Sequence, residues 1–307
     1  MKKSALKFIL KSFLVFILLT SCEDVVDITL DEGTPQLTID AWLTNQPGVQ
    51  TIRLTETASY FDNTANPPAL GATVVVTSQE GIIYNFLDDD NDGNYVWTPT
   101  EGGVSFGEIG KGYGLAVEYK GETFIAATFM QRVATVDSIT FDFEEKSLGT
   151  PEGYYGQFYA RDFVGENDCY WVKTYKNGTF LGKPQEINIA YDAGTSAGGN
   201  VDGLIFIPPI RNGINRFPDL DDSSEDGTDV APWALGDSVY VELWSITPDT
   251  FFFLEQARNQ MTNGGLFASP IANVPTNIQN ANTNSEVKAL GYFCTSAVSS
   301  LGSRVEE

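Results

Sequence analysis

The stretch Leu37-Thr38-Ile39-Asp40-Ala41-Trp42-Leu43-Thr44 decides the fold class of this chain. Leu37, Ile39 and Ala41 alternate with more polar neighbours, and a period of two is typical of a β-strand with one buried face. Polar and apolar side chains alternate again over residues 51–55. Residues 72–77 are rich in β-branched side chains, which favour strands. Since no helical period competes, the sequence predicts a mainly β protein.

Further strand patterns divide the chain into two predicted domains. Short strands with turn signals about every 8 to 12 residues predict an immunoglobulin-like β-sandwich over residues 35–133. Residues 134–307 are predicted to form a second, β-rich domain, in which Asn177-Gly178 is a strong hairpin signal. Outside the first three segments, the expected strands are 82–87, 95–97, 113–119, 123–128, 139–143, 169–175, 204–207 and 237–244.

One main helix is expected, near residues 248–261. Thr247 is a good N-cap, Pro248 suits the first helical position, and Asp249 favours the positive end of the helix dipole. Four side chains at helical spacing predict one face that packs on the second sheet. Asn263-Gly264-Gly265 is expected to end the helix. The members of that face are Phe251, Leu254, Arg258 and Met261.

The first 21 residues have the features of a secretory signal peptide. They contain four lysines and no acid, and the apolar run 12–19 is too short to span a membrane. Leu19-Thr20-Ser21-Cys22 resembles a bacterial lipobox, so we expect Cys22 to carry lipid that anchors the protein. The alternative is a soluble periplasmic protein with an incidental cysteine.

An acidic tether over residues 22–34 follows the lipid site. Its acids Glu23, Asp24 and Asp27 resemble the export signal of Bacteroidota lipoproteins that face the medium from the outer membrane. A solvated linker on an acidic protein is the alternative.

Composition excludes several classes of function. The chain has 18 basic and 41 acidic residues, a net charge of −23 and no histidine. Histidine-based nucleophile activation and imidazole metal sites are therefore absent. A chain this acidic repels polyanions, so nucleic acid is excluded as a natural partner. The G-x-S-x-G match at residues 194–198 is interpreted as a loop, because a nucleophile elbow needs a histidine base and a following helix.

Acidic runs offer candidate cation sites. Asp88, Asp90 and Asp92, followed by Gly93, match the start of a calcium loop. The closing ligand is missing, since the twelfth position is Pro99, and a charged hairpin tip is the alternative. The second run, residues 219–229, is interpreted as a solvated loop with potential for partner or cation contact.

Two cysteines remain after lipidation. Cys169 and Cys294 are candidates for a disulfide in an oxidising compartment, and two buried thiols are the alternative. Five tryptophans could form a sugar-binding platform or fill the cores. Carboxylate pairs for glycoside hydrolysis are not singled out by spacing.

In order and spacing, these segments resemble the Bacteroidota lipoprotein family known as domain of unknown function 4249. The matching pieces are residues 21–23, 37–44, 52–57, 60–62, 71–76, 112–115, 120–126, 236–241, 245–249, 277–278 and 291–293. Family members are often encoded beside TonB-dependent transporters, which implies an accessory role in nutrient capture at the cell surface. The family has no established catalytic residues.

The leading expectation is thus a non-enzymatic, surface-exposed outer-membrane lipoprotein that binds a ligand or a TonB-dependent transporter. The alternatives are a structural adhesion or envelope-assembly lipoprotein and, more remotely, a carboxylate-dependent glycan hydrolase.

Overall fold

The computed structural model describes residues 33–59, 64–100, 105–165, 167–218, 230–263 and 274–306. The chain divides after Thr34, and Pro35–Glu307 forms one compact unit. Cys22, the acids Glu23, Asp24 and Asp27 and the acidic run 219–229 lie outside the described residues. No helix within the described ranges has the length and apolar character needed to cross a bilayer.

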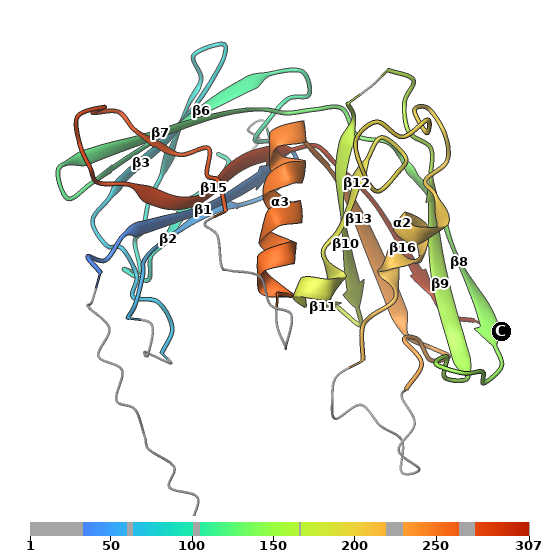
Figure 1. Ribbon diagram of the computed structural model, residues 1–307. Helices are drawn as coiled ribbons and strands as arrows, with labels where there is room; N and C mark the ends of the chain where they lie inside the picture. Colours follow the sequence, from blue (N-terminus) through green and yellow to red (C-terminus); the bar gives the residue numbers. More distant parts are fainter. Residues whose placement is uncertain are drawn as a thin grey trace, which may run out of the picture. The chain divides into compact units, whose positions relative to one another are not determined.

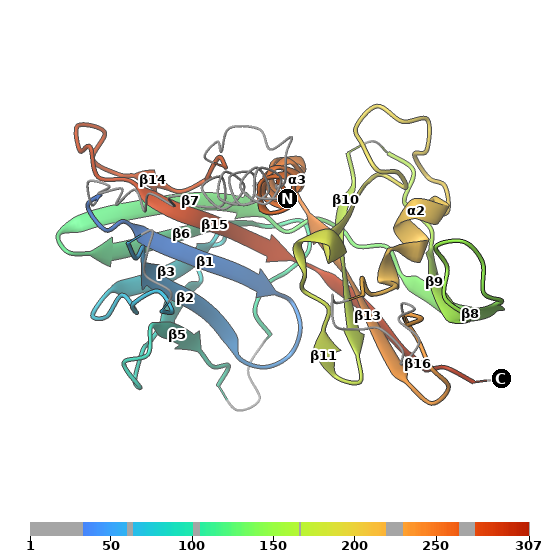
Figure 2. The ribbon, with the colours of Figure 1, turned by 60° about the horizontal axis from the view of Figure 1, so that its bottom comes forward.

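The predicted mainly β fold is confirmed, and two sheets pack face to face in its first half (Figure 2). One has the order β15-β1-β2-β5, and the other has the order β14-β7-β6-β3-β4. Their strands are β1 (Leu37–Thr44), β2 (Gln50–Glu56), β3 (Thr73–Ser78), β4 (Ile83–Phe86), β5 (Asn94–Trp97), β6 (Gly112–Tyr119), β7 (Glu122–Phe129), β14 (Gln279–Asn280) and β15 (Ala289–Ser296).

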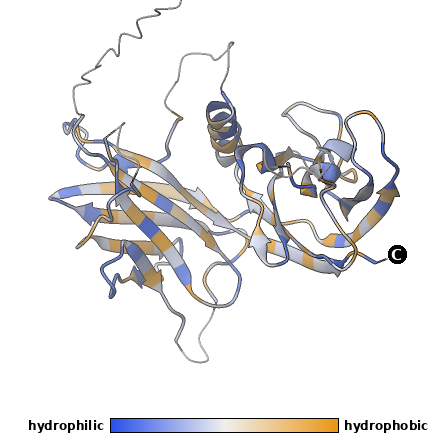
Figure 3. Ribbon diagram, turned by 90° about the horizontal axis from the view of Figure 1, so that it is seen from below, coloured by the Kyte–Doolittle hydropathy of each residue, from blue (hydrophilic) through white to orange (hydrophobic). Residues whose placement is uncertain are grey.

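The alternation in the sequence places one face of each strand in the sandwich core. Ile39, Ala41 and Leu43 of β1 are fully buried, whereas Asp40 between them is exposed. Val74 and Val76 of β3 enter the same core from the facing sheet. Hydrophobic and hydrophilic bands therefore alternate along these strands (Figure 3).

The second half contains a sheet of order β11-β10-β13-β16, with β12 also paired to β10, and a separate hairpin of β8 and β9. Its strands are β8 (Val136–Glu144), β9 (Gly153–Ala160), β10 (Cys169–Lys176), β11 (Thr179–Phe180), β12 (Asn188–Tyr191), β13 (Ser238–Ile246) and β16 (Val298–Arg304). Short helical turns form at η1 (Pro184–Glu186), α2 (Pro208–Arg211) and η2 (Asn212–Ile214). A second core, which includes Phe158, Tyr170 and Phe206, lies between these elements.

The end of the chain returns to the first half. Strand β15 pairs in parallel with β1, from Leu37 opposite Ala289 to Thr44 opposite Ser296. Only Ala297 separates β15 from β16, so one extended segment contributes to both halves. Strands β14 and β15, which lie beyond the predicted boundary at residues 133/134, thus complete the two sheets of the first half.

Helix α3 (Pro248–Met261) forms at the predicted position. Thr247 caps it by accepting the N–H of Thr250 at 3.2 Å, and the helix lies beside β10 and β12 (Figure 1). Phe251 and Leu254 are buried as expected. Met261 is 56% exposed, so the predicted face does not extend to the end of the helix.

The two cysteines belong to a third hydrophobic cluster, which also includes Tyr191, Phe251 and Tyr292. Both Cys169 and Cys294 are buried free thiols, so the disulfide predicted between them is not formed in this structure. Burial raises the pKa of the Cys294 thiol to about 11, which keeps it protonated and unreactive near neutral pH.

Candidate functional site

A pocket of about 550 Å³ is formed in the second half by loops and strand ends. This volume falls in the range of small-molecule sites. The lining combines aliphatic and proline side chains with amides and two arginines. It consists of Gly149, Pro151, Tyr155, Gln185, Ile187, Asn188, Ile189, Thr195, Pro209, Ile210, Asn212, Gly213, Asn215, Arg216, Phe217, Pro218, Val230, Pro232 and Arg258.

One side of the pocket is the contact between β12 and the α2–η2 turn. Pro208 occupies the first turn of α2, where its missing N–H costs nothing. Asn188 then donates its Nδ2 to the carbonyl of Ile210 at 2.8 Å. A Cβ on Gly213 would come within 2.3 Å of that amide, so the close approach needs glycine.

Asn215 fixes the next part of the lining. Its Oδ1 accepts the N–H of Gly156 at 2.8 Å and the indole N–H of Trp233 at 3.0 Å. Its Nδ2 donates to the carbonyls of Gly156 at 3.1 Å and Asn212 at 2.8 Å. Because these bonds use the whole amide, Asn215 positions the pocket and leaves ligand recognition to other groups.

The charged part of the pocket wall is basic. Arg258, in the last turn of α3, donates Nη1 to the carbonyl of Ile187 at 3.0 Å, and Arg216 contributes a second guanidinium to the lining. Among the described lining residues there is no aspartate or glutamate. Nearby, Glu186 accepts the backbone N–H groups of Lys183 and Phe217 at 2.9 and 3.0 Å.

A second hollow of about 600 Å³ lies along α3 and β7. Its lining includes Ile125, Phe252 and Phe253, and its one described charged residue is Asp249. Its described lining holds no cation, and two of its polar side chains, Thr276 and Asn277, already bond to the backbone of β15, so the pocket with the arginines is the stronger candidate.

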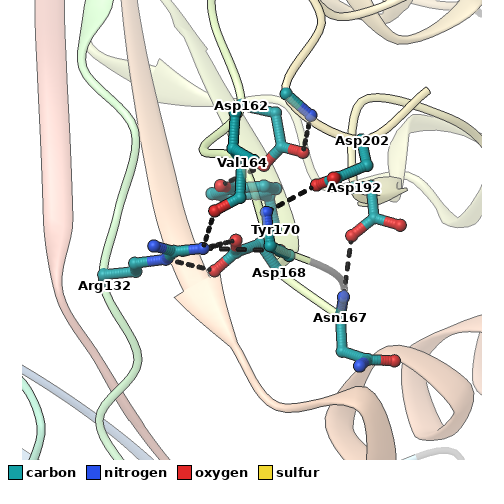
Figure 4. Close-up of polar contacts among 10 residues, drawn as sticks. Arg132, Asp162, Val164, Asn167, Asp168, Tyr170, Asp192 and Asp202 are labelled. Carbon is teal, nitrogen blue, oxygen red and sulfur yellow. Dashed lines mark hydrogen bonds and ion pairs between the residues drawn. The ribbon is translucent and has the colours of Figure 1, made fainter.

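Three carboxylates form a separate cluster near the start of β10 (Figure 4). One oxygen each of Asp162, Asp192 and Asp202 lies within 4.8 Å of the others. Asp162 is 3% exposed and Asp192 is 5% exposed. We refer to these three residues as the aspartate triad.

Hydrogen bonds hold each member of the triad. Asp162 accepts the hydroxyl of Tyr170 at 2.7 Å and the N–H of Gly203 at 3.2 Å. Asp192 accepts the N–H of Asn167 at 2.9 Å, and Asp202 accepts the N–H of Gly165 at 3.0 Å.

The neighbouring Asp168 has a cationic partner. Arg132 donates Nε to its Oδ1 at 2.9 Å and pairs with the same carboxylate through Nη2 (Figure 4). Arg132 also contacts the carbonyl of Val164 at 3.2 Å. This bidentate pair fixes the loop that brings Asp168 beside the triad.

Burial raises the pKa of both Asp162 and Asp192, and neighbouring aspartates add to the effect. Three close carboxylates can share protons, or they can provide oxygen ligands to a hard cation such as Ca²⁺, which prefers carboxylates. If calcium bound here, backbone carbonyls or water would have to complete its shell of about six to eight oxygens.

The calcium ligands predicted at Asp88, Asp90 and Asp92 do not converge. Asp88 accepts the N–H groups of Asp92 and Gly93 at 3.1 and 3.2 Å, and Asp92 accepts that of Asn94 at 2.8 Å. The run forms the turn between β4 and β5, with Asp90 exposed. Asp88 and Asp92 thus bond to the backbone of their own turn, as short acidic turns commonly do, and calcium binding at this run stays a prediction.

Other sequence candidates take structural roles. Residues 194–198 form a loop with no helix after it, as expected. Trp97 packs on Tyr84 and Trp233 is buried, while Trp42 contacts Trp171 at a ring distance of 5.0 Å. Trp233 therefore lies within a core, and Trp42, Trp97 and Trp171 pack against cores as partly buried side chains.

Sequence reasoning missed both the arginine pocket and the aspartate triad. Asp192 lies 30 positions after Asp162 and 10 positions before Asp202, and these separations match no metal-ligand motif. Arg258 was assigned only to the packed face of α3. The sequence contained one indirect signal for the pocket, because Arg258 interrupts an otherwise apolar helix face.

Comparison with known sequences adds one assignment. Residues 23–301 match the family described as "Domain of unknown function (DUF4249)". None of the curated proteins compared with the chain matches it. Because the match covers nearly the whole sequence, from the acidic tether to β16, the chain belongs to the DUF4249 family.

Proposed function

We propose that this protein is a non-enzymatic, ligand-binding lipoprotein of the outer membrane that faces the extracellular side and assists a TonB-dependent nutrient transporter. Lipid on Cys22 would anchor it, and the pocket beside α3 would hold the ligand. The proposal joins the sequence motifs at the start of the chain to the pocket in its second half.

The composition of the pocket carries the proposal. Its described lining combines an apolar wall with amides and arginines, which suits the binding of a small molecule. It includes no carboxylate, thiol or lysine among the residues that the structure describes. Those groups provide most nucleophiles and general bases in a chain without histidine. The lining therefore favours binding over hydrolysis.

The proposed location rests on the start of the sequence. Leu19-Thr20-Ser21-Cys22 has the spacing of a lipobox, and Glu23, Asp24 and Asp27 follow directly. Two or three acyl chains hold a soluble domain firmly on a bilayer. The transporter partnership comes from the family resemblance alone, by analogy.

The direct test is purification of the full chain with a C-terminal tag from gently solubilised membranes. We expect a TonB-dependent transporter to co-purify in stoichiometric amount, and we expect protease to cleave the protein on intact cells. Cys22→Ser is the matched control, because it removes the lipid site and leaves the folded part unchanged.

The outcomes separate the candidate functions. A partner barrel recovered with the wild type and lost with Cys22→Ser would support the proposal. A lone protein, protected from protease, would contradict it. A phenotype in surface attachment or envelope integrity, with unchanged growth on every nutrient, would favour the structural alternative.

A further inference from the structure

Arg258 is a half-buried cation on the pocket wall, with no acidic partner among the residues that the structure describes. Its guanidinium donates one hydrogen bond, to the carbonyl of Ile187 at 3.0 Å. Within the described part of the chain it has neither an ion pair nor an aromatic contact. Since a guanidinium carries five N–H donors and stays charged, most of its donors remain for water or a ligand.

Four other half-buried cations in the described part of the chain are neutralised or covered. Two have ion pairs, and two lie over aromatic rings. They are Lys111 with Glu80, Lys176 with Asp237, Lys173 between Trp171 and Trp244, and Arg211 over Tyr159. These partners offset the cost of withdrawing a charge from water. Arg258 has no such compensation among the described residues, although the chain has 41 acids.

The surroundings of Arg258 favour a ligand that is both anionic and partly apolar. Arg216 adds positive charge to the same lining, and no described lining residue is acidic. The carboxylate of Glu186 is bonded to backbone N–H groups. Ile189 and Phe217 provide apolar lining, which an inorganic ion alone would not use.

We propose that the pocket binds a small organic carboxylate, with Arg258 as its main polar contact. The planar guanidinium fork matches a carboxylate with two parallel hydrogen bonds, which makes such contacts strong and directional. The bond to Ile187 orients the fork, and the aliphatic and proline side chains hold the body of the ligand. This inference rests on the proposed ligand-binding function and names its substrate class.

The test compares charged probes with neutral analogues of nearly the same shape. Galacturonate is paired with galactose, and benzoate with benzamide, and inorganic phosphate serves as an anion without an organic body. Melting temperature and titration calorimetry on the full mature chain measure binding at fixed ionic strength. We expect at least one carboxylate to bind and to stabilise the protein more than its neutral analogue or phosphate does.

Arg258→Gln should weaken carboxylate binding by roughly tenfold or more, the usual loss for a charged hydrogen bond. Arg258→Lys keeps the charge without the fork and should give an intermediate affinity. Arg304→Gln is the matched control, because Arg304 also donates to one backbone carbonyl, that of Gly236 at 3.1 Å, and lies outside the pocket lining. Circular dichroism and melting without ligand verify that each variant folds.

Three results would overturn the inference: equal binding of charged and neutral analogues, unchanged binding by Arg258→Gln, or no stabilisation by any carboxylate. Stronger binding of phosphate than of both carboxylates would also overturn it, in favour of a phosphate site. Binding of galactose or benzamide with unchanged affinity in Arg258→Gln would leave the pocket as a ligand site while rejecting the anionic class. Failure of a transporter to co-purify would contradict the proposed partnership and leave the carboxylate-binding inference unchanged.

Discussion

Two acidic regions of this protein look alike in composition and differ in structure. The hairpin run at residues 88–92 is continuous in sequence, and its carboxylates bond to the backbone of their own turn. The aspartate triad comes from three separate segments and is largely buried. The comparison shows that a continuous run of acids can serve only to form a turn. Tertiary structure, in contrast, can bring together carboxylates whose positions in the sequence form no recognisable motif.

The pKa shifts of the aspartates in the two regions also have opposite directions. Burial raises the pKa of Asp162 and Asp192. In the hairpin, the hydrogen bonds from Asn94 lower the pKa of Asp92. The triad therefore opposes ionisation, while the hairpin favours it.

The largest expected difference is in stability. Asp162→Ala removes the acceptor for the buried Tyr170 hydroxyl and for the Gly203 N–H, so we expect a loss of about 3 kcal/mol in the free energy of unfolding. Asp90→Ala, at the exposed hairpin tip, should change it by less than about 0.5 kcal/mol. Urea denaturation measures both, and similar losses would show that the regions do not differ.

The next prediction concerns Arg132, which pairs with Asp168 beside the triad. Arg132→Gln leaves Asp168, whose side chain is 7% exposed, without its charged partner. We expect a loss of about 2 kcal/mol. Lys120→Gln is the control, because it removes one partner of the exposed Lys120–Glu56 pair and should cost less than about 1 kcal/mol. A loss from Lys120→Gln as large as that from Arg132→Gln would contradict this ranking.

The pH dependence of stability should differ in sign between the regions. In the triad the folded pKa lies above the unfolded value, so the native state binds protons first and gains stability as pH falls from neutral through the folded pKa. Asp192→Asn removes one such group and should reduce that gain.

In the hairpin, Asp92 contributes stability above its ordinary pKa, and that contribution is lost as pH falls through the lowered folded value. Asp92→Asn should therefore have its destabilising effect at neutral pH and lose it in acid. Urea midpoints measured from neutral to acid pH for both variants check the two signs. The same pH trend in both would reject the assigned shifts.

The smallest effect is expected for calcium at the hairpin. Asp90→Asn should leave the response of melting temperature to calcium unchanged, because Asp88 and Asp92 already accept backbone N–H groups. Magnesium is the control cation. If the wild type showed a calcium-dependent rise and this variant did not, the result would support the sequence-based prediction of a calcium loop.

Local patterns predicted the first half well. Strands such as β1 and β3 have one buried and one more exposed face, so apolar side chains recur at every second position of their sequences. The start of α3 was predictable for the same reason, because Thr247, Pro248 and Asp249 affect only the first turn of the helix.

The second half was harder to predict for physical reasons. Strand β9 contains Gly153 and Gly156, which weaken its strand pattern. All four residues of β12 are buried, which removes any alternation. The strand expected at 204–207 is only a bridge between Ile205 and Arg161. Both candidate sites depend on these elements, because the lining of the pocket and the triad are assembled from loops distant in sequence.

The pairing of β15 with β1 affects the order in which the molecule can fold. The amide oxygen of Asn45 accepts the N–H of Val298, 253 positions further along. During synthesis the first strand therefore presents unpaired N–H and C=O groups until almost the entire chain has emerged. High contact order of this kind slows folding, and an open strand edge invites association with other chains. A truncation before residue 289 would leave that edge permanently exposed, so loss of a short terminal segment should cause aggregation of the whole protein.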